Sequence, residues 1–357
     1  MVRAGLVAMA LTACAHAKPD LDTQVSDAVD KVMVTSGQWA EVDDAGARAY
    51  VRAVGMRIVR AAGDGREWRF RVVDDPEVQG EANTGTTVYV SRGALVRLRD
   101  EAELAALLGH EIGHVLVGHA HDALVEKMRD VAVETHDRDR DDEIQADQLA
   151  VLLIAKAGYD PRAVETMLRA LAAGDPPGDE AAVHPPWPQR LIRVRALASQ
   201  LPAGGAHNAR EFVDHMRTLV VGDDPRAASM VGNAIVLARV GVALDLPPGT
   251  VSAVAGTTAL AAVDGNAVAI KPVTRELAKY ITPSSEPGMV TFVRRGRAGA
   301  VMIAIAGDTP ERTLATIHLR APTPAELAQI HPQFVDFGAP RELYGDTKIG
   351  LVTPNGM

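Results

Sequence analysis

The stretch HEIGH, residues 110–114, combines two histidines and a glutamate at a spacing that could bind a metal ion and use it. Residues four apart lie on one face of an α-helix, so His110 and His114 can offer two imidazole nitrogens to a single ion. Glu111 would then point toward whatever that ion activates. In a chain with 11 histidines the same pattern can arise by chance on a solvated helix face, so the rest of the site has to come from elsewhere.

A second stretch, DDEIQADQLA, supplies two acidic groups one helical turn apart. A hydrolytic zinc site needs three protein ligands and one open position for water, and Glu143 would complete a His, His, Glu set. Asp147 is then placed to accept the outer N–H of a ligand histidine and to fix its tautomer. These residues predict one Zn²⁺ per chain, which activates water for hydrolysis with Glu111 as the general base.

Three helices are expected in this region, and the first two carry these residues. AELAALLGHEIGHVLVGH is rich in Ala, Leu and Glu without proline, which predicts a helix from Ala102 to His119. A second helix is expected to begin at Glu143 and to stop at Gly158, after a charged stretch that includes a solvated loop. RLIRVRALASQL predicts the third helix, and the proline-rich residues 172–188 before it predict an irregular loop.

The flanking regions predict a small sheet before the first of these helices. After the third helix they predict mainly strands. Apolar residues at helical intervals between residues 26 and 62 predict one or two helices, and FRVVDD and TVYVSRG predict two strands. Beyond Pro225, stretches rich in Val, Gly and Thr predict strands, and Thr323 with Glu326 forms a capping-box pattern. We therefore expect an α+β protein with a mainly helical domain over residues 26–221 and a smaller α+β accessory domain over residues 222–357.

Three stretches together resemble one family: DEAELAALLGHEIGHVLVGH, DEIQADQLAVLLIAKAGYDP and HPPWPQRLIRV. They are similar to the zinc metallopeptidases that include the CAAX prenyl protease, HtpX and the periplasmic β-barrel-assembly-enhancing protease. The resemblance runs from about Ser26 to Gln200 and implies a gluzincin-type domain. It also implies His110, His114 and Glu143 as zinc ligands.

His184 and Arg190 match the family's HPxxxxR element. The resemblance favours a role for both in stabilising the oxyanion that forms when the peptide carbonyl is attacked. Alternatively, His184 could occupy the open zinc position and hold the enzyme idle, or the pair could be a loop histidine and a helix-surface arginine. His119 fits neither the helix-face spacing nor a family position, and we interpret it as a solvated histidine.

A peptide substrate has to reach such a site as an extended chain. The strand Thr86–Ser91 could hold it by strand addition if it lies at a sheet edge, or it could be an ordinary interior strand. The preceding VQGEANTGTTVYV departs from the Asn-Ala turn of many family members. We expect an endopeptidase acting on unfolded or misassembled envelope proteins, and a chaperone-like protein that binds peptides in the same groove without cleavage is the alternative.

The beginning of the chain predicts a location. Leu11-Thr12-Ala13-Cys14 follows a short apolar run and resembles a lipobox, so residues 1–13 would be a lipoprotein signal peptide, Cys14 the lipidated residue and 14–25 a linker. The alternative is an amino-terminal helix with an incidental cysteine. A lipidated Cys14 would anchor the protein to a membrane of the bacterial envelope, facing the periplasm, and the alanine after it favours the outer membrane. The net charge of −9 with no basic block argues against nucleic acid as a partner.

Overall fold

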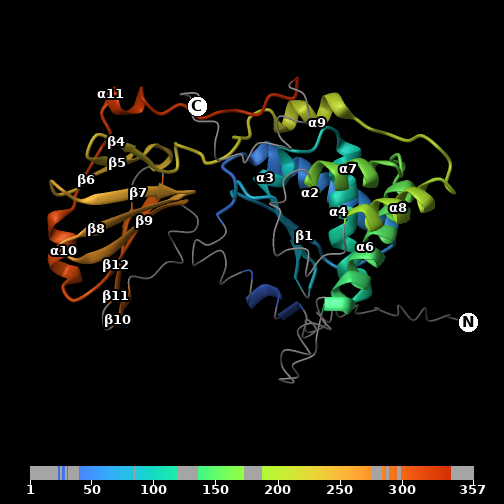
Figure 1. Cartoon of the computed structure of the whole chain (residues 1–357), viewed down its shortest axis with the longest axis horizontal. Coiled ribbons are helices and arrows are strands. Elements are labelled where there is room, and N and C mark those ends of the chain that lie inside the picture. Colours follow the sequence, from blue (N-terminus) through green and yellow to red (C-terminus); the bar gives the residue numbers. More distant parts are fainter. Residues whose placement is uncertain are drawn as a thin grey trace, which may run out of the picture.

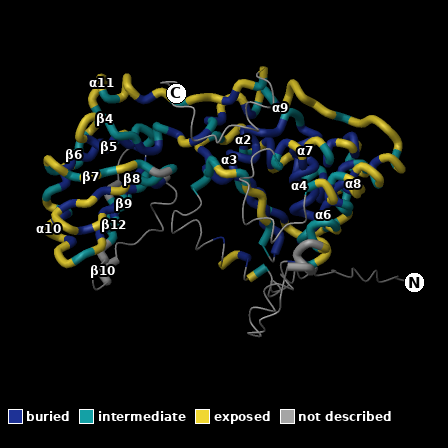
Figure 2. Tube along the Cα trace, viewed as in Figure 1, coloured by how far each residue is buried: buried dark blue, intermediate teal, exposed yellow. Residues whose placement is uncertain are grey.

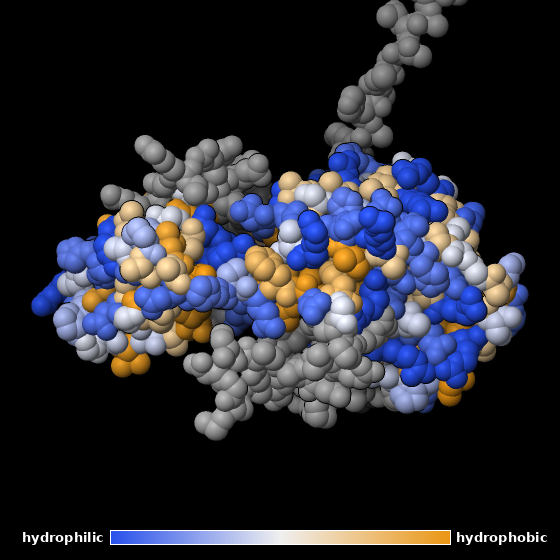
Figure 3. Space-filling model, turned by 90° about the horizontal axis from the view of Figure 1, so that it is seen from above, coloured by the Kyte–Doolittle hydropathy of each residue, from blue (hydrophilic) through white to orange (hydrophobic). Residues whose placement is uncertain are grey.

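The computed structural model describes residues 23–24, 26–28, 30, 40–83, 85–119, 136–172, 187–274, 284–286, 289–295 and 299–338. A helical unit with a small sheet lies beside a strand-rich unit (Figure 1), and the fold is α+β as predicted. Seen from above, hydrophilic side chains dominate the surface, while apolar ones gather toward the middle of the molecule (Figure 3). Within the described ranges, every helix is too short or too polar to cross a membrane.

The helical unit contains most of the helices. They are α2 (Ala45–Ala62), α3 (Arg92–Leu95), α4 (Glu101–Val117), α6 (His136–Lys156), α7 (Ala163–Ala172), α8 (Trp187–Ala198) and α9 (Ala209–Met216). Helix α4 matches the predicted HEIGH helix to within two residues at each end. Helix α6 begins at His136, so part of the charged stretch before Glu143 is helical, where a loop was predicted. The short amphipathic helix α7 was not predicted.

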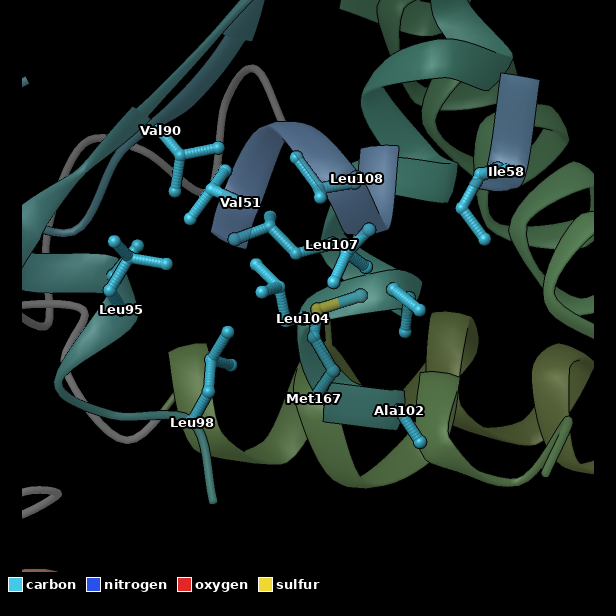
Figure 4. Close-up of a cluster of buried hydrophobic side chains, with 14 of the residues drawn as sticks. Val51, Ile58, Val90, Leu95, Leu98, Ala102, Leu104, Leu107, Leu108 and Met167 are labelled. Carbon is cyan, nitrogen blue, oxygen red and sulfur yellow. The ribbon is translucent and has the colours of Figure 1, made fainter. Parts of the chain in front are cut away.

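Helix α4 runs through the middle of the core because its apolar residues surround it on several sides. The carboxylate of Asp100 caps its start by accepting the N–H of Glu103 at 2.8 Å. Leu104, Leu107 and Leu108 of α4 lie among side chains from α2, the sheet and α7 (Figure 4). The helix that carries HEIGH is therefore held from several directions, which fixes where its polar residues point.

The small sheet has the strand order β1-β3-β2, formed by β1 (Arg69–Val73), β2 (Gly80–Ala82) and β3 (Thr87–Ser91). Strand β3 pairs in parallel with β1 on one side and antiparallel with β2 on the other. The hypothesis that Thr86–Ser91 is an edge strand is wrong, and the interior-strand alternative is right. Strand β2 was not predicted because it is only three residues long and contains none of the β-branched and aromatic residues typical of strands.

The strand-rich unit has two antiparallel sheets. Its strands are β4 (Ser229–Val231), β5 (Ala234–Leu237), β6 (Val242–Asp245), β7 (Val251–Ala255), β8 (Thr258–Val263), β9 (Asn266–Thr274), β10 (Ser284–Glu286), β11 (Met289–Arg295), β12 (Gly299–Ala306) and β13 (His318–Arg320). Apolar residues of both sheets share one buried core, which appears dark blue along the strands in Figure 2. Two short helices, α10 (Pro310–Thr316) and α11 (Pro324–Leu327), flank it, and the predicted Thr323–Glu326 capping box is present.

The end of the described chain returns from the strand-rich unit to the helical unit. Val221 donates its N–H to Gln333 O at 2.8 Å, and Val335 donates its N–H to Leu219 O at 3.0 Å. Val335 is buried in the core of the helical unit, against which Phe337 also packs. Most residues of the first core precede residue 222 in the sequence, but Val335 and Phe337 also belong to it.

A buried network of charges joins the two units. Asp74, after β1, accepts hydrogen bonds from Arg92 Nε at 2.6 Å and from Arg239 of the strand-rich unit. Arg92 also donates to the carbonyls of Val220 and Gly222, in the connection between the units. The Asp74 side chain is 0% exposed and that of Arg92 is 2% exposed, so each charge depends on the other for compensation.

We predict that Asp74→Ala lowers the free energy of unfolding by about 3 kcal/mol, because it leaves the charges of Arg92 and Arg239 buried without this partner. Urea denaturation, with the metal content held constant, measures the change. The control is Arg169→Ala, which breaks an exposed i,i+4 pair with Glu165 and should cost about 0.5 kcal/mol or less. Equal effects of the two substitutions would contradict the prediction.

Candidate metal centre

His110, His114 and Glu143 come together at one point between α4 and α6. Their ligand atoms all lie within 4.8 Å of one another, the one such group of His, Cys, Asp and Glu found among the described residues. The Nε2 atoms of the two histidines are 3.1 Å apart. Glu143 Oε1 lies 3.2 Å from His114 Nε2, and Glu143 Oε2 lies 3.4 Å from His110 Nε2. Two imidazole nitrogens and a carboxylate are a donor set that suits a zinc ion with an open fourth position.

Two glycines of α4 allow this close approach. A Cβ atom added to Gly109 would meet Ile154 Cγ2 at 3.3 Å, and one added to Gly113 would meet Ala146 O at the same distance. Both contacts are with α6, so the backbones of the two helices lie closer than larger residues would permit. Because Gly109 precedes His110 and Gly113 precedes His114 in the sequence, the close packing occurs where the ligands have to converge.

Behind the three ligands lies a buried ion pair of Asp147 and Arg190. Asp147 Oδ1 is 3.1 Å from His110 Nδ1, as predicted for a group that holds the outer side of a ligand histidine. Arg190 of α8 donates from Nε at 2.7 Å and from Nη2 at 2.8 Å to the two oxygens of Asp147. Its Nη1 lies 3.0 Å from Glu143 Oε2. One guanidinium thus orients both a ligand carboxylate and the carboxylate behind His110.

This arrangement settles the charge of Asp147. Burial raises the pKa of Asp147, but the hydrogen bonds from Arg190 and the contact with His110 outweigh it and hold the pKa below its ordinary value. Asp147 is therefore a carboxylate at neutral pH and can only accept. A proton on His110 Nδ1 is favoured, which leaves Nε2 as the ligand atom.

The two ligand histidines differ in their affinity for protons. Burial lowers the pKa of His110, but the charge of Glu143 and the contacts with Asp147 and Glu143 outweigh it and raise that pKa to about 10. Burial lowers the pKa of His114, and the neighbouring positive charge of His110 adds to this effect. Without a metal, the pair therefore holds its extra proton on His110.

Arg190 is neither a helix-surface residue nor a free donor. Its side chain is 4% exposed, and three of its nitrogens contact the carboxylates of Asp147 and Glu143. These contacts give Arg190 a positioning role on the ligand side of the site, which the sequence did not suggest. The oxyanion role stays a prediction for both Arg190 and His184. His184 lies outside the described residues, as does Cys14.

Glu111 lies beside strand β2. Its side chain belongs to the buried part of α4, with the residue 6% exposed. A Cβ atom added to Gly80 would come within 2.7 Å of Glu111 Oε1 and within 3.2 Å of Leu107 Cδ1. In the part of the chain that the structure describes, β2 is the last strand on this side of the sheet. The backbone of an edge strand therefore passes next to the predicted general base.

His119 is also part of the site, and the prediction that it is solvated is wrong. It is 9% exposed, and its Nδ1 lies 2.9 Å from Nδ1 of the ligand His114. Gly118 explains the placement, since it ends α4 with φ at 89°, a left-handed conformation that turns the chain back on the last helical turn. The Gly-His pair at the end of the predicted helix was the sequence signal for this contact, because a glycine there can end the helix.

The region that contains the candidate ligands matches one known protein family. Residues 47–135 and 135–198 match the family model described as peptidase family M48. Both α4 and α6, with all three candidate ligands, lie inside the matched region. The match ends at the close of α8, so it includes Arg190 and excludes the strand-rich unit.

Individual relatives match this chain at low sequence identity and over part of its length. The mitochondrial metalloendopeptidase OMA1 of Arabidopsis thaliana is 30% identical over 150 residues, which are 36% of this chain and 31% of that protein. The β-barrel assembly-enhancing protease of Escherichia coli O157:H7 is 24% identical over 261 residues, 61% of this chain and 51% of that protein. OMA1 of Schizosaccharomyces pombe is 26% identical over 177 residues, 43% of this chain and 52% of that protein. The chain thus spans between about a third and a half of the length of these relatives.

We predict that zinc binding displaces about one proton, because His110 has to lose its extra proton to become a ligand. Between pH 6 and pH 8, both below the pKa of about 10, zinc affinity should therefore rise about tenfold per pH unit. Calorimetric titration in two buffers of different ionisation enthalpy counts the protons released. A zinc affinity that does not change over this range would contradict the assigned protonation of His110.

Proposed function

Because residues 47–198 form a peptidase family M48 domain, we propose that this chain is a zinc-dependent endopeptidase. One observation carries the proposal: two histidines of α4 and a glutamate of α6 converge on one point, while Glu111, next to the first histidine, lies beside an edge strand. The ligand set, the candidate base and a place for an extended peptide are thus within one small region of the described chain.

The zinc ion, held by His110, His114 and Glu143, would supply Lewis-acid polarisation and a lowered pKa for water. The carboxylate of Glu111 accepts the proton of the attacking water and passes it to the nitrogen of the leaving amine. Asp147 and Arg190 keep the ligands in one orientation throughout, because a buried, bidentate ion pair has little freedom to move.

Strand β2 is our candidate for the substrate-binding element. A peptide that adds to β2 would be extended and would be held mainly through its backbone, which selects unfolded segments over a particular sequence. It would pass close to Glu111, since the backbone at Gly80 leaves room for only a hydrogen atom there. This transfers to β2 the strand-addition role that the sequence had suggested for residues 86–91.

Unfolded or misassembled envelope proteins are our proposed substrates. The name of the Escherichia coli relative refers to β-barrel assembly, which supports misassembled proteins as substrates. The lipobox-like sequence at Cys14 supports an envelope location with the protein anchored to the membrane. A chaperone-like protein that only binds peptides is the alternative function. The carboxylate of Glu111 argues against it, because binding alone needs no general base.

Glu111→Gln tests the proposal. We predict that this variant keeps its zinc, since all three ligands remain, but loses cleavage of unfolded casein by a factor of about 10² or more because the base is lost. Zinc content by elemental analysis and casein digestion with and without chelator are the measurements. The matched control, His318→Gln, changes an exposed residue of the strand-rich unit and should leave both quantities unchanged. Near-normal digestion by the Glu111 variant would favour the alternative function.

Gly80→Ala tests the placement of β2. The added methyl group would lie 2.7 Å from Glu111 Oε1, so the carboxylate has to shift, and we predict a fall in kcat by about 10- to 100-fold. Zinc content should be unchanged, because Glu111 is not a ligand. Gly65→Ala is the control, since a Cβ there has nothing within 4 Å. Unaltered kcat in the Gly80 variant would show that this strand lies away from the reacting atoms.

A further inference from the structure

His119 contacts the metal site from the side opposite the ligand atoms. The Nε2 atom of His114 faces His110 and Glu143, whereas its Nδ1 atom lies 2.9 Å from Nδ1 of His119. The second nitrogen of His119, Nε2, lies 3.1 Å from Gln145 Oε1 and 3.3 Å from Asp142 Oδ1, both on α6. His119 therefore bridges the end of α4 to the part of α6 that provides Glu143.

The chemistry of these partners fixes which nitrogen carries each proton. The ionised carboxylate of Asp142 is an acceptor only, so Nε2 of His119 is the donor there, whichever way the amide of Gln145 is turned. A neutral His119 with its proton on Nε2 has a lone pair on Nδ1. That lone pair can accept a hydrogen bond from the Nδ1–H of His114. The tautomer so defined leaves the lone pair of His114 Nε2 pointing into the ligand cluster.

On the basis of the proposed zinc site, we propose that His119 is a positioning residue that accepts the Nδ1–H of His114 and holds this ligand in its metal-binding tautomer and orientation. The two ligand histidines thus have different outer partners. His110 faces an anionic carboxylate that Arg190 clamps, while His114 faces a neutral imidazole that α6 holds. Loss of an outer partner of this kind typically weakens metal binding by about 10- to 100-fold.

A purely structural role for His119 predicts a different order of substitutions. If the imidazole only filled space at the end of α4, leucine would replace it well and small polar residues would not. If it acts as an acceptor, asparagine should substitute best, because its Oδ1 can take the position of Nδ1. Glutamine reaches toward Gln145 and Asp142 instead and offers no acceptor at that position.

The experiment compares His119→Asn, His119→Gln and His119→Leu in the full chain, with His318→Leu as the control for an exposed histidine. Zinc affinity is measured by competition with a chromogenic chelator, and the visible spectrum of the Co²⁺-loaded protein reports ligand geometry. We expect the Gln and Leu variants to bind zinc about 10- to 100-fold more weakly and to shift the Co²⁺ bands. The Asn variant should recover most of the affinity and the normal spectrum.

Either of two results would overturn the proposal: normal zinc affinity in the Gln and Leu variants, or an Asn variant no better than the Gln variant. The Asn and Gln comparison stays decisive if the Leu variant does not fold, since both residues are polar amides. Failure of the proposed function is recognised separately. A wild-type chain that does not bind zinc would refute the metal site itself, whereas normal wild-type binding with unaffected variants would refute only the role of His119.

Discussion

The buried ion pair of Asp147 and Arg190 is the constraint on which the candidate site depends. Two charges taken out of water are costly unless each finds its partner with good geometry, and here the guanidinium meets both oxygens of the carboxylate. The pair ties α8 to α6, and through His110 it ties both to α4. The orientation of a ligand from each of two helices thus follows from one contact that cannot be relaxed without leaving a charge buried alone.

Helix α6 has the larger part in building the site, although α4 carries the recognisable motif. Glu143 is a candidate ligand, Asp147 lies behind His110, and Asp142 and Gln145 lie behind His119. These four residues lie within two helical turns, so a rotation of α6 would displace all of them together. The close packing at Gly109 and Gly113 prevents such a rotation, since it leaves little space between the helices.

The parts that could be predicted from the sequence were those that a local pattern encodes. The helix of HEIGH, several strands of the second unit and the Thr323–Glu326 capping box all follow from spacing and composition within a short window. The position of β2 beside Glu111, the burial of His119 and the contacts of Arg190 depend on how distant segments pack. Patterns within α4 or α8 hold no information about which carboxylate a side chain will meet, so the contacts of Arg190 with Asp147 and Glu143 could not be predicted.

The charge network around Asp74 and the return of residues 333–337 have a consequence for the cooperativity of the molecule. Each unit has its own core, yet Asp74 of the helical unit, which pairs with Arg92, also pairs with Arg239 of the strand-rich unit. Val335, which follows the strand-rich unit in the sequence, is buried in the core of the helical unit. Melting of the strand-rich unit would expose apolar surface and uncompensated charge in its neighbour. The two units should therefore lose their structure in a single thermal transition, and a fragment that ends near residue 222 would not be an independent peptidase domain.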